Sequence, residues 1–232
     1  HLAFATKNAE EVASLFIKDA KHSNGINGLQ EFQVPEQLTQ GVFSRFTPMT
    51  ELRGNSTEYV ERMDHIGIAS NNNVIAESIF AGKLGLPVES RQTDMEVKVS
   101  MESFTSDKYG VIYKTRPPET MGGLRVSFIT IGDTELEFLE NFNNQHRAEI
   151  AHGTPGTTKQ DQGAITKYVD KYGPGLHHLA FKTPNINQTL KHLAKHHFKL
   201  IDAIGREGSR RSMIGFINPA STGGVLIHFV ER

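Results

Sequence analysis

A short apolar segment occurs three times in this chain of 232 residues, and this repetition limits the folds that the chain can adopt. Residues 1–6 read HLAFAT, residues 178–183 read HLAFKT, and residues 64–70 read DHIGIAS, a looser copy. Each segment has the length and apolar character of a strand and leads through a polar turn into a segment of helical periodicity. Repeated segments of this kind predict repeated structural units. We therefore expect modules that each begin with strand, turn and helix.

The segments that follow the three copies complete the predicted unit. Apolar residues recur at helical spacing after each copy: Val12, Leu15, Phe16 and Ala20; Val74, Ile75, Ile79, Phe80 and Leu84; and Ile186, Leu190, Leu193 and Ala194. Strand-like residues 123–128 and 135–139 then flank Gly132-Asp133, a favoured hairpin turn, and residues 212–217 and 224–230 flank a turn-rich connection. The pattern is β-α-β-β, and we expect one further strand in each module.

This pattern predicts an α+β chain with three parts. Residues 1–60 form a partial or extra βα module, in which residues 41–46 could add a strand. Residues 61–232 form two paired modules, 61–141 and 163–232. Residues 142–162 are polar and lack periodicity, which is typical of a linker.

Composition narrows the chemistry and the partners. The chain has no cysteine and 11 histidines, so any bound metal needs nitrogen and oxygen ligands. It has 25 Lys and Arg against 26 Asp and Glu, a balance that argues against nucleic acid or an anionic membrane as partner. No apolar run approaches the ~18 residues of a membrane span, so we expect a cytoplasmic protein.

Four potential metal ligands interrupt the apolar strands. His65, Glu137, His178 and His228 each stand among aliphatic or aromatic neighbours. Burial of such groups is costly unless they bind a partner, although a single strand histidine is more often a hydrogen-bonded structural residue. Their joint occurrence at corresponding places in repeated modules favours a shared metal ion. Strand alternation predicts that His177 faces away from this group.

The ligand set leaves the metal open. Three imidazoles and one carboxylate suit Zn²⁺, Ni²⁺, Fe²⁺, Co²⁺ or Mn²⁺. His1 repeats the position of His178, but residues 1–60 show no matching carboxylate, so a second metal centre is not expected there.

Five segments carry a resemblance to a known family: Met63–Ala69, Lys83–Leu86, Gly132–Leu139, Gly173–Phe181 and Asn218–Ile227. Over residues 62–232 the sequence resembles the vicinal oxygen chelate superfamily, especially its methylmalonyl-CoA epimerase and glyoxalase I branch, and more weakly the hydroxyphenylpyruvate-type dioxygenases. The resemblance implies tandem βαβββ modules that form a U-shaped mixed sheet around a divalent metal, the glyoxalase/bleomycin resistance/dioxygenase fold.

The resemblance also implies site residues. The family's ligand positions fall on His65, Glu137 and His178, while the fourth, a proton-moving glutamate in epimerases and glyoxalases, falls on His228. An imidazole can ligate a metal or accept a proton, so His228 and Glu137 are the candidate catalytic residues. Residues 89–121 are an insertion relative to the epimerases, and it holds further candidate acids and bases: Asp94, Glu96, Glu102, Asp107, Tyr109 and Tyr113.

The leading functional hypothesis is a metal-dependent isomerase or lyase that transfers a proton next to a carbonyl. The alternatives are an Fe(II)-dependent ring-cleaving or 2-oxo-acid dioxygenase and a non-catalytic small-molecule binding protein. Substrates would be an acyl-CoA, a 2-oxo compound or a similar small molecule. Arg206, Arg210 and Arg211 are the candidate substrate-binding residues, because they could contact the phosphates of coenzyme A. A homodimer is a candidate assembly.

Overall fold

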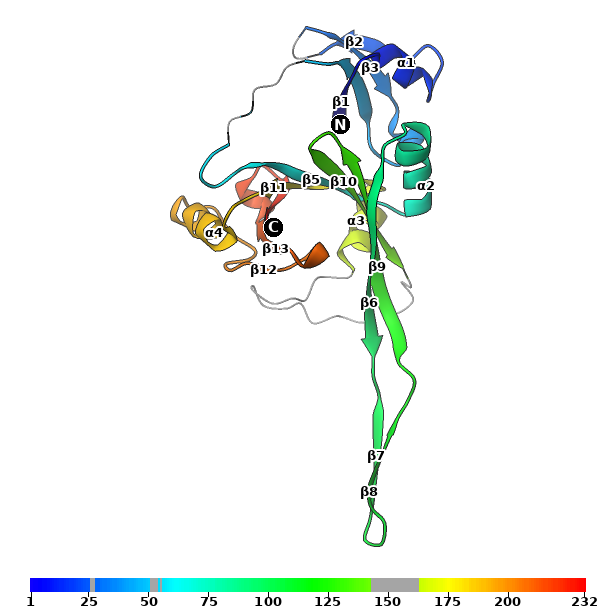
Figure 1. Cartoon of the computed structure of the whole chain (residues 1–232), viewed down its shortest axis with the longest axis vertical. Coiled ribbons are helices and arrows are strands. Elements are labelled where there is room, and N and C mark those ends of the chain that lie inside the picture. Colours follow the sequence, from blue (N-terminus) through cyan, green and yellow to red (C-terminus); the bar gives the residue numbers. More distant parts are fainter. Residues whose placement is uncertain (26–27, 51–53, 55, 143–162) are drawn as a thin grey trace.

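The structure, a computed structural model, describes residues 1–25, 28–50, 54, 56–142 and 163–232. The predicted linker, 142–162, lies outside the described residues except for Phe142. Strands and helices follow one another as three modules, and a long two-stranded arm projects from the second (Figure 1).

The N-terminal module contains more strands than the sequence predicts. It consists of β1 (Leu2–Thr6), α1 (Ala9–Ser14), β2 (His22–Asn24), β3 (Gln30–Val34) and β4 (Ser44–Pro48). These strands form a four-stranded sheet in the order β1-β4-β3-β2, in which β1 and β4 are parallel. The expected strand at 41–46 begins three residues later, at Ser44. β2 and β3 were not predicted, because HSN is short and polar and QEFQV carries few of the residues that favour strands.

The first paired module follows the same path. It contains β5 (Arg62–Ala69), α2 (Asn73–Glu77) with a π-helical continuation (Ser78–Lys83), β6 (Val88–Lys98), β9 (Glu119–Ile131) and β10 (Thr134–Phe142). Gly132 and Asp133 form the turn between β9 and β10, as predicted, and Gly132 has a φ of 61°, a left-handed value that glycine adopts readily. Within the 89–121 insertion, β7 (Met101–Ser106) and β8 (Gly110–Thr115) pair to form the projecting arm (Figure 1).

The second paired module begins with a helix that the sequence did not reveal. Its elements are α3 (Ala164–Tyr172), β11 (Gly175–Lys182), α4 (Ile186–Lys195), β12 (Arg206–Glu207), a 3₁₀ turn (Ser209–Arg211), β13 (Met213–Ile217), a second 3₁₀ turn (Pro219–Ser221) and β14 (Leu226–Glu231). On α4, Ile186 and Leu190 are buried, as predicted from their spacing.

The two paired modules share an eight-stranded mixed sheet in the order β12-β13-β14-β11-β5-β10-β9-β6. The first strands of the two modules, β5 and β11, lie antiparallel at its centre. Each is flanked by the last strand of its own module, and both of these pairs, β5 with β10 and β11 with β14, are parallel. The sheet curls into a half-barrel. The predicted α+β fold of tandem βαβββ modules is thereby confirmed.

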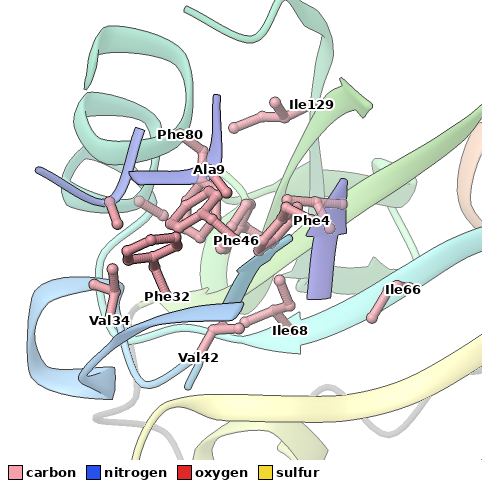
Figure 2. Packing of buried hydrophobic residues seen from close by; sticks show 14 residues of the cluster. Phe4, Ala9, Phe32, Val34, Val42, Phe46, Ile66, Ile68, Phe80 and Ile129 are labelled. Carbon is pink, nitrogen blue, oxygen red and sulfur yellow. The ribbon is translucent and has the colours of Figure 1, made fainter. Parts of the chain in front are cut away.

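One apolar core joins the N-terminal module to the first paired module. Phe4 and Phe46 stack at 5.6 Å between ring centroids, and Phe80 lies 6.4 Å from Phe4 and is fully buried (Figure 2). Ile66 and Ile68 of β5 enter the same core. Because side chains alternate along a strand, β5 turns His65 toward the opposite face of the sheet.

In the second helical segment, the buried residues are not all those that the sequence predicts. Val74 and Ile75 are 78% and 47% exposed, whereas Ala76 and Phe80 are buried. The buried residues Asn73, Ala76 and Phe80 follow α-helical spacing, and Val74 and Ile75 lie outside the face that they form. On the first helical segment, Leu15 is likewise exposed, against the prediction.

Candidate metal centre

The first and last strands of each paired module bring four potential ligands together. β5 carries His65, β10 carries Glu137, β11 carries His178 and β14 carries His228, and all four side chains are buried. Glu137 lies opposite Gly67, two residues beyond His65, and His228 lies opposite Ala180, two residues beyond His178. Each module therefore contributes two potential ligands with the same offset, and the pairing of β5 with β11 places the two pairs side by side.

Two overlapping sets of these side chains are close enough to share an ion: His65, His178 and Glu137, and the three histidines. His65 Nε2 lies 3.2 Å from His178 Nε2 and 3.3 Å from Glu137 Oε2, and His178 Nε2 lies 3.2 Å from that oxygen. The ligand nitrogens of the three histidines lie within 4.8 Å of one another. Two donors at the usual zinc distance in tetrahedral geometry stand about 3.3 Å apart, which matches these separations.

A hydrogen bond at Nδ1, the ring nitrogen that does not face His178 and Glu137, orients His65. His65 Nδ1 lies 2.8 Å from Asp64 Oδ1, and this carboxylate also accepts from Arg232 Nη2 at 3.0 Å. Burial lowers the pKa of His65, but the negative charges and hydrogen bonds of Glu137 and Asp64 outweigh it and raise the pKa to about 9. A carboxylate behind a histidine is the usual outer-shell support of a metal-binding imidazole, because it directs the other ring nitrogen toward the ion.

His178 and its neighbour His177 both line the cavity, so the predicted opposite orientation of His177 is wrong. β11 and β5 pair Leu176 with Ile68 and His178 with the adjacent Gly67, which leaves His177 as an extra, bulged residue. A bulge interrupts strand alternation. His177 Nδ1 lies 3.0 Å from His178 Nδ1, and burial lowers the pKa of His177 to about 4.

His228 provides the clearest test of whether a metal fits. Its ring is buried, and neither Nδ1 nor Nε2 has a hydrogen-bond partner among the described residues. Burial, together with the charges of His178 and His65, holds the pKa of His228 well below its usual value. A buried imidazole without partners is costly, and a metal ion would provide the missing interaction. The residues therefore fit a divalent metal.

Gly67 and Glu137 complete the geometry. A Cβ atom at Gly67 would lie 2.0 Å from Cε1 of His178, so this position on β5 leaves room for the imidazole. Burial raises the pKa of Glu137, but the charge and hydrogen bonds of His65 and His178 outweigh it and hold the pKa well below the usual value. Glu137 is therefore ionised and can act as an anionic ligand.

A cavity of about 260 Å³ opens over the four side chains. Its walls include Phe128, Leu139, Ile214, Phe216 and Val230. Arg206 and Arg210 line it, whereas Arg211 does not and is exposed, so the structure brings only two of the three predicted arginines to the site.

Those candidate acids and bases of the insertion whose side chains the structure describes do not line this cavity. Among the described side chains, Asp94 lies on β6, Glu102 on β7 and Tyr113 on β8, while Asp107 and Tyr109 lie at the tip of the arm. The side chain of Glu96 lies outside the described part. His177, in contrast, is a cavity residue that alternation alone could not identify.

Comparison with known proteins identifies the family of this chain. The Glyoxalase/Bleomycin resistance protein/Dioxygenase superfamily matches residues 64–216, and the chain belongs to it. The uncharacterized protein YqjC of Bacillus subtilis (strain 168) is 27% identical over 172 residues, which span 74% of this chain and 93% of YqjC.

Two solved structures illustrate the likeness of fold. A hypothetical protein of Bacillus halodurans C-125 has a TM-score of 0.51 and 22% identity, covering 74% of this chain and 94% of its own. Methylmalonyl-CoA epimerase from Mycobacterium tuberculosis has a TM-score of 0.50 and 22% identity, covering 77% and 93% of the two chains. At this identity the likeness shows the fold alone. Among the described residues, no helix is long and apolar enough to cross a membrane.

Proposed function

We propose that this protein is a divalent-metal-dependent enzyme that transfers a proton at the carbon next to a carbonyl group, as an isomerase, epimerase or glyoxalase-type lyase. The observation that carries the proposal is His228, a buried imidazole whose two nitrogens have no hydrogen-bond partner among the described residues. It is grouped with His65 and His178 and lines the same cavity as Glu137. Within this proposal those four residues are the metal ligands.

Within this proposal, different residues bind the metal, orient its ligands and transfer the proton. His65, His178 and Glu137 form the closely spaced group that holds the ion, with Asp64 orienting His65. A divalent ion bound there would supply Lewis-acid stabilisation of the negative charge that develops on a carbonyl oxygen. His228 is neutral because burial lowers its pKa, so it can complete the ligand set or accept a proton from the substrate. Apolar side chains form much of the wall around that position.

The donor set favours proton transfer over oxygenase chemistry. Non-haem iron oxygenases typically use two histidines and one carboxylate, which leaves several positions open. Here a third imidazole, that of His228, belongs to the cluster. Zn²⁺, Ni²⁺, Co²⁺, Mn²⁺ and Fe²⁺ are all compatible with nitrogen and oxygen ligands.

The comparisons support a small carbonyl compound as substrate. One structural neighbour is a methylmalonyl-CoA epimerase in complex with methylmalonyl-CoA and NH4+, with 20% identity and a TM-score of 0.50. We therefore propose an acyl-CoA or a 2-oxo compound.

Two measurements test the proposal. Elemental analysis of protein purified without chelators should find about one equivalent of a divalent transition metal or zinc per chain. The metal-loaded protein should then incorporate solvent deuterium next to the carbonyl of methylmalonyl-CoA or 2-oxobutyrate.

Three results would contradict the proposed function, and each points to a different conclusion. Absence of stoichiometric metal, both as purified and after reconstitution, would refute the metal centre. Retained metal without deuterium exchange would indicate a binding protein. Oxygen-labile iron with substrate-dependent oxygen uptake would indicate a dioxygenase.

A further inference from the structure

Two arginines stand at matching places beside the candidate metal centre. Phe128 lies opposite Glu137 in the first paired module, and Phe216 lies opposite His228 in the second. The guanidinium carbon of Arg210 is 3.4 Å from the ring centroid of Phe128, and that of Arg206 is 5.4 Å from the ring centroid of Phe216. The two positive charges thus flank the cavity, one over each aromatic wall.

The aromatic rings connect the arginines to the candidate ligands. Phe216 meets His228 edge-on at 4.5 Å between ring centroids, and Phe128 meets His65 edge-on at 6.3 Å. A group held by Arg206 would therefore lie about one aromatic ring away from the imidazole of His228.

The two arginines differ in how many of their donors are already used. Arg210 donates through Nη1 to Glu135 at 2.7 Å and through Nη2 to Glu89, so two carboxylates neutralise it. Arg206 donates through Nε to Asp202 at 3.0 Å. Its Nη1 is buried and has no hydrogen-bond partner among the described residues. Among the described residues, Arg206 thus has a buried terminal nitrogen without a partner, whereas the buried nitrogen without a partner on Arg210 is Nε. Arg232, which also lines the cavity, donates to Asp64 and Glu135.

A buried guanidinium donor without an acceptor is costly, and a carboxylate matches its planar, charged geometry. Water could satisfy the same donor, but a substrate carboxylate would do so with opposite charge. The cavity is lined by Arg206 and by the candidate metal ligands together, so one small molecule can contact both.

We propose that Arg206 binds a carboxylate of the substrate, and that the substrate class is a small acid, free or esterified at a second carboxyl group, whose carboxylate lies close to the carbonyl under attack. This inference rests on the proposed function, because the metal centre would hold the carbonyl. It replaces the expectation that arginines 206, 210 and 211 jointly contact the phosphates of coenzyme A.

The test compares a charged probe with a neutral one. Isothermal titration of the zinc-loaded protein with 2-oxobutyrate and with 2-oxobutyramide gives the ratio of their dissociation constants. The wild type should prefer the acid, and Arg206→Gln should reduce that preference about 10- to 100-fold while the affinity for the amide stays within about twofold. Arg211→Gln, which changes an arginine outside the cavity, should behave as the wild type.

Separate readouts keep the outcomes distinct. Zinc content reports the proposed metal centre, and the acid-to-amide ratio reports Arg206. An Arg206→Gln variant that holds zinc and keeps the full preference for the acid would overturn the role of Arg206. If Arg206→Gln does not fold, Arg206→Lys is measured instead, because it keeps the charge but loses the planar donors. Its preference for the acid over the amide should fall by a smaller factor than in Arg206→Gln. An unchanged acid-to-amide ratio would also overturn the proposal.

Discussion

The N-terminal module and the paired modules use the same strand arrangement but carry different residues at the decisive position. In the paired modules, the residue of the last strand opposite Gly67 is Glu137, and the one opposite Ala180 is His228. In the N-terminal module, the residue opposite Ala3 is Arg45, which donates to Glu31 at 2.9 Å. A guanidinium cannot ligate a cation. A repeated scaffold thus creates the position for a ligand, but the residue type there decides whether a metal centre can form.

The neighbours of the first strand differ as well. β5 and β11 pair with each other, so the two halves of the ligand set meet. In the part of the chain that the structure describes, β1 pairs with β4 alone and lies at the edge of its sheet. The proposed metal centre therefore needs two modules joined through their first strands, each with a potential ligand on its last strand.

The difference between the modules predicts that substitution of Glu137 has the largest effect on metal binding. Glu137→Arg, which gives the first paired module the residue of the N-terminal module, should abolish stoichiometric metal binding, because it replaces an anionic ligand with a cation among imidazoles. Glu137→Gln keeps the shape and should lower metal affinity by more than about 100-fold. Elemental analysis and competition with a chromophoric chelator measure both. Arg45→Gln is the matched control, and loss of metal in that variant would contradict the distinction between the modules.

The shared core predicts a large effect on stability. Phe80→Ala should lower the free energy of unfolding by about 3–5 kcal/mol, because its fully buried ring packs with side chains of both the N-terminal and the first paired module. Denaturant titration should show one transition for both modules. Val74→Ala, at a 78% exposed position, should change stability by less than about 0.5 kcal/mol. Two separate transitions in the wild type would show that the modules do not depend on a common core.

Gly67 tests how closely the ligands are packed. Gly67→Ala makes this position like Ala3 and Ala180, but its Cβ would meet the ring of His178 at 2.0 Å. We expect the ring to move and metal affinity to fall about 10- to 100-fold, measured by the same competition assay. Gly82→Ala is the control, because its nearest non-neighbouring atom would lie 3.9 Å away. Unchanged metal affinity in Gly67→Ala would mean that His178 is not held where the structure places it.

The smallest expected effect is on stability, and it concerns the contacts between helix α2 and the sheet in the first paired module. In the first paired module, Glu77 on α2 accepts from Arg91 Nη2 at 2.6 Å and from Ser127 Oγ at 2.7 Å. The hydrogen bonds of Arg91 hold the pKa of Glu77 below its usual value, against a smaller opposing effect of burial. A carboxylate with a lowered folded-state pKa stabilises the fold above its unfolded pKa and loses that contribution as the pH falls through the folded value.

Glu77→Gln should therefore lower stability slightly at pH 7, and by less as the pH falls through the folded-state pKa of Glu77. Denaturant titrations at pH 7 and at about pH 3 check this difference. An equal effect at both pH values would mean that the charge of Glu77 does not contribute.

Sequence periodicity predicted the strands of the paired modules well, because β5, β9, β10, β11 and β14 are long or apolar and are bounded by turn residues. It also found the four candidate ligands, since a polar side chain in an apolar strand stands out. It missed α3, and it missed β2 and β3, whose sequences are short or polar.

One feature depended on a local departure from regular geometry. The orientation of His177 depends on a bulge between β11 and β5. Such a bulge has no sequence signal as strong as simple alternation. The free donor of Arg206 follows from tertiary contacts with Asp202 and Phe216, which no sequence pattern shows.

X-ray absorption spectroscopy of the zinc-loaded protein tests the central claim most directly. If His65, Glu137, His178 and His228 hold one ion, the spectrum should show only nitrogen and oxygen neighbours at about 2.0–2.1 Å, with multiple scattering from several imidazoles. The His228→Ala variant should lose one imidazole from that shell. A zinc ion surrounded by oxygen without imidazole scattering, or a spectrum that His228→Ala leaves unchanged, would contradict the account.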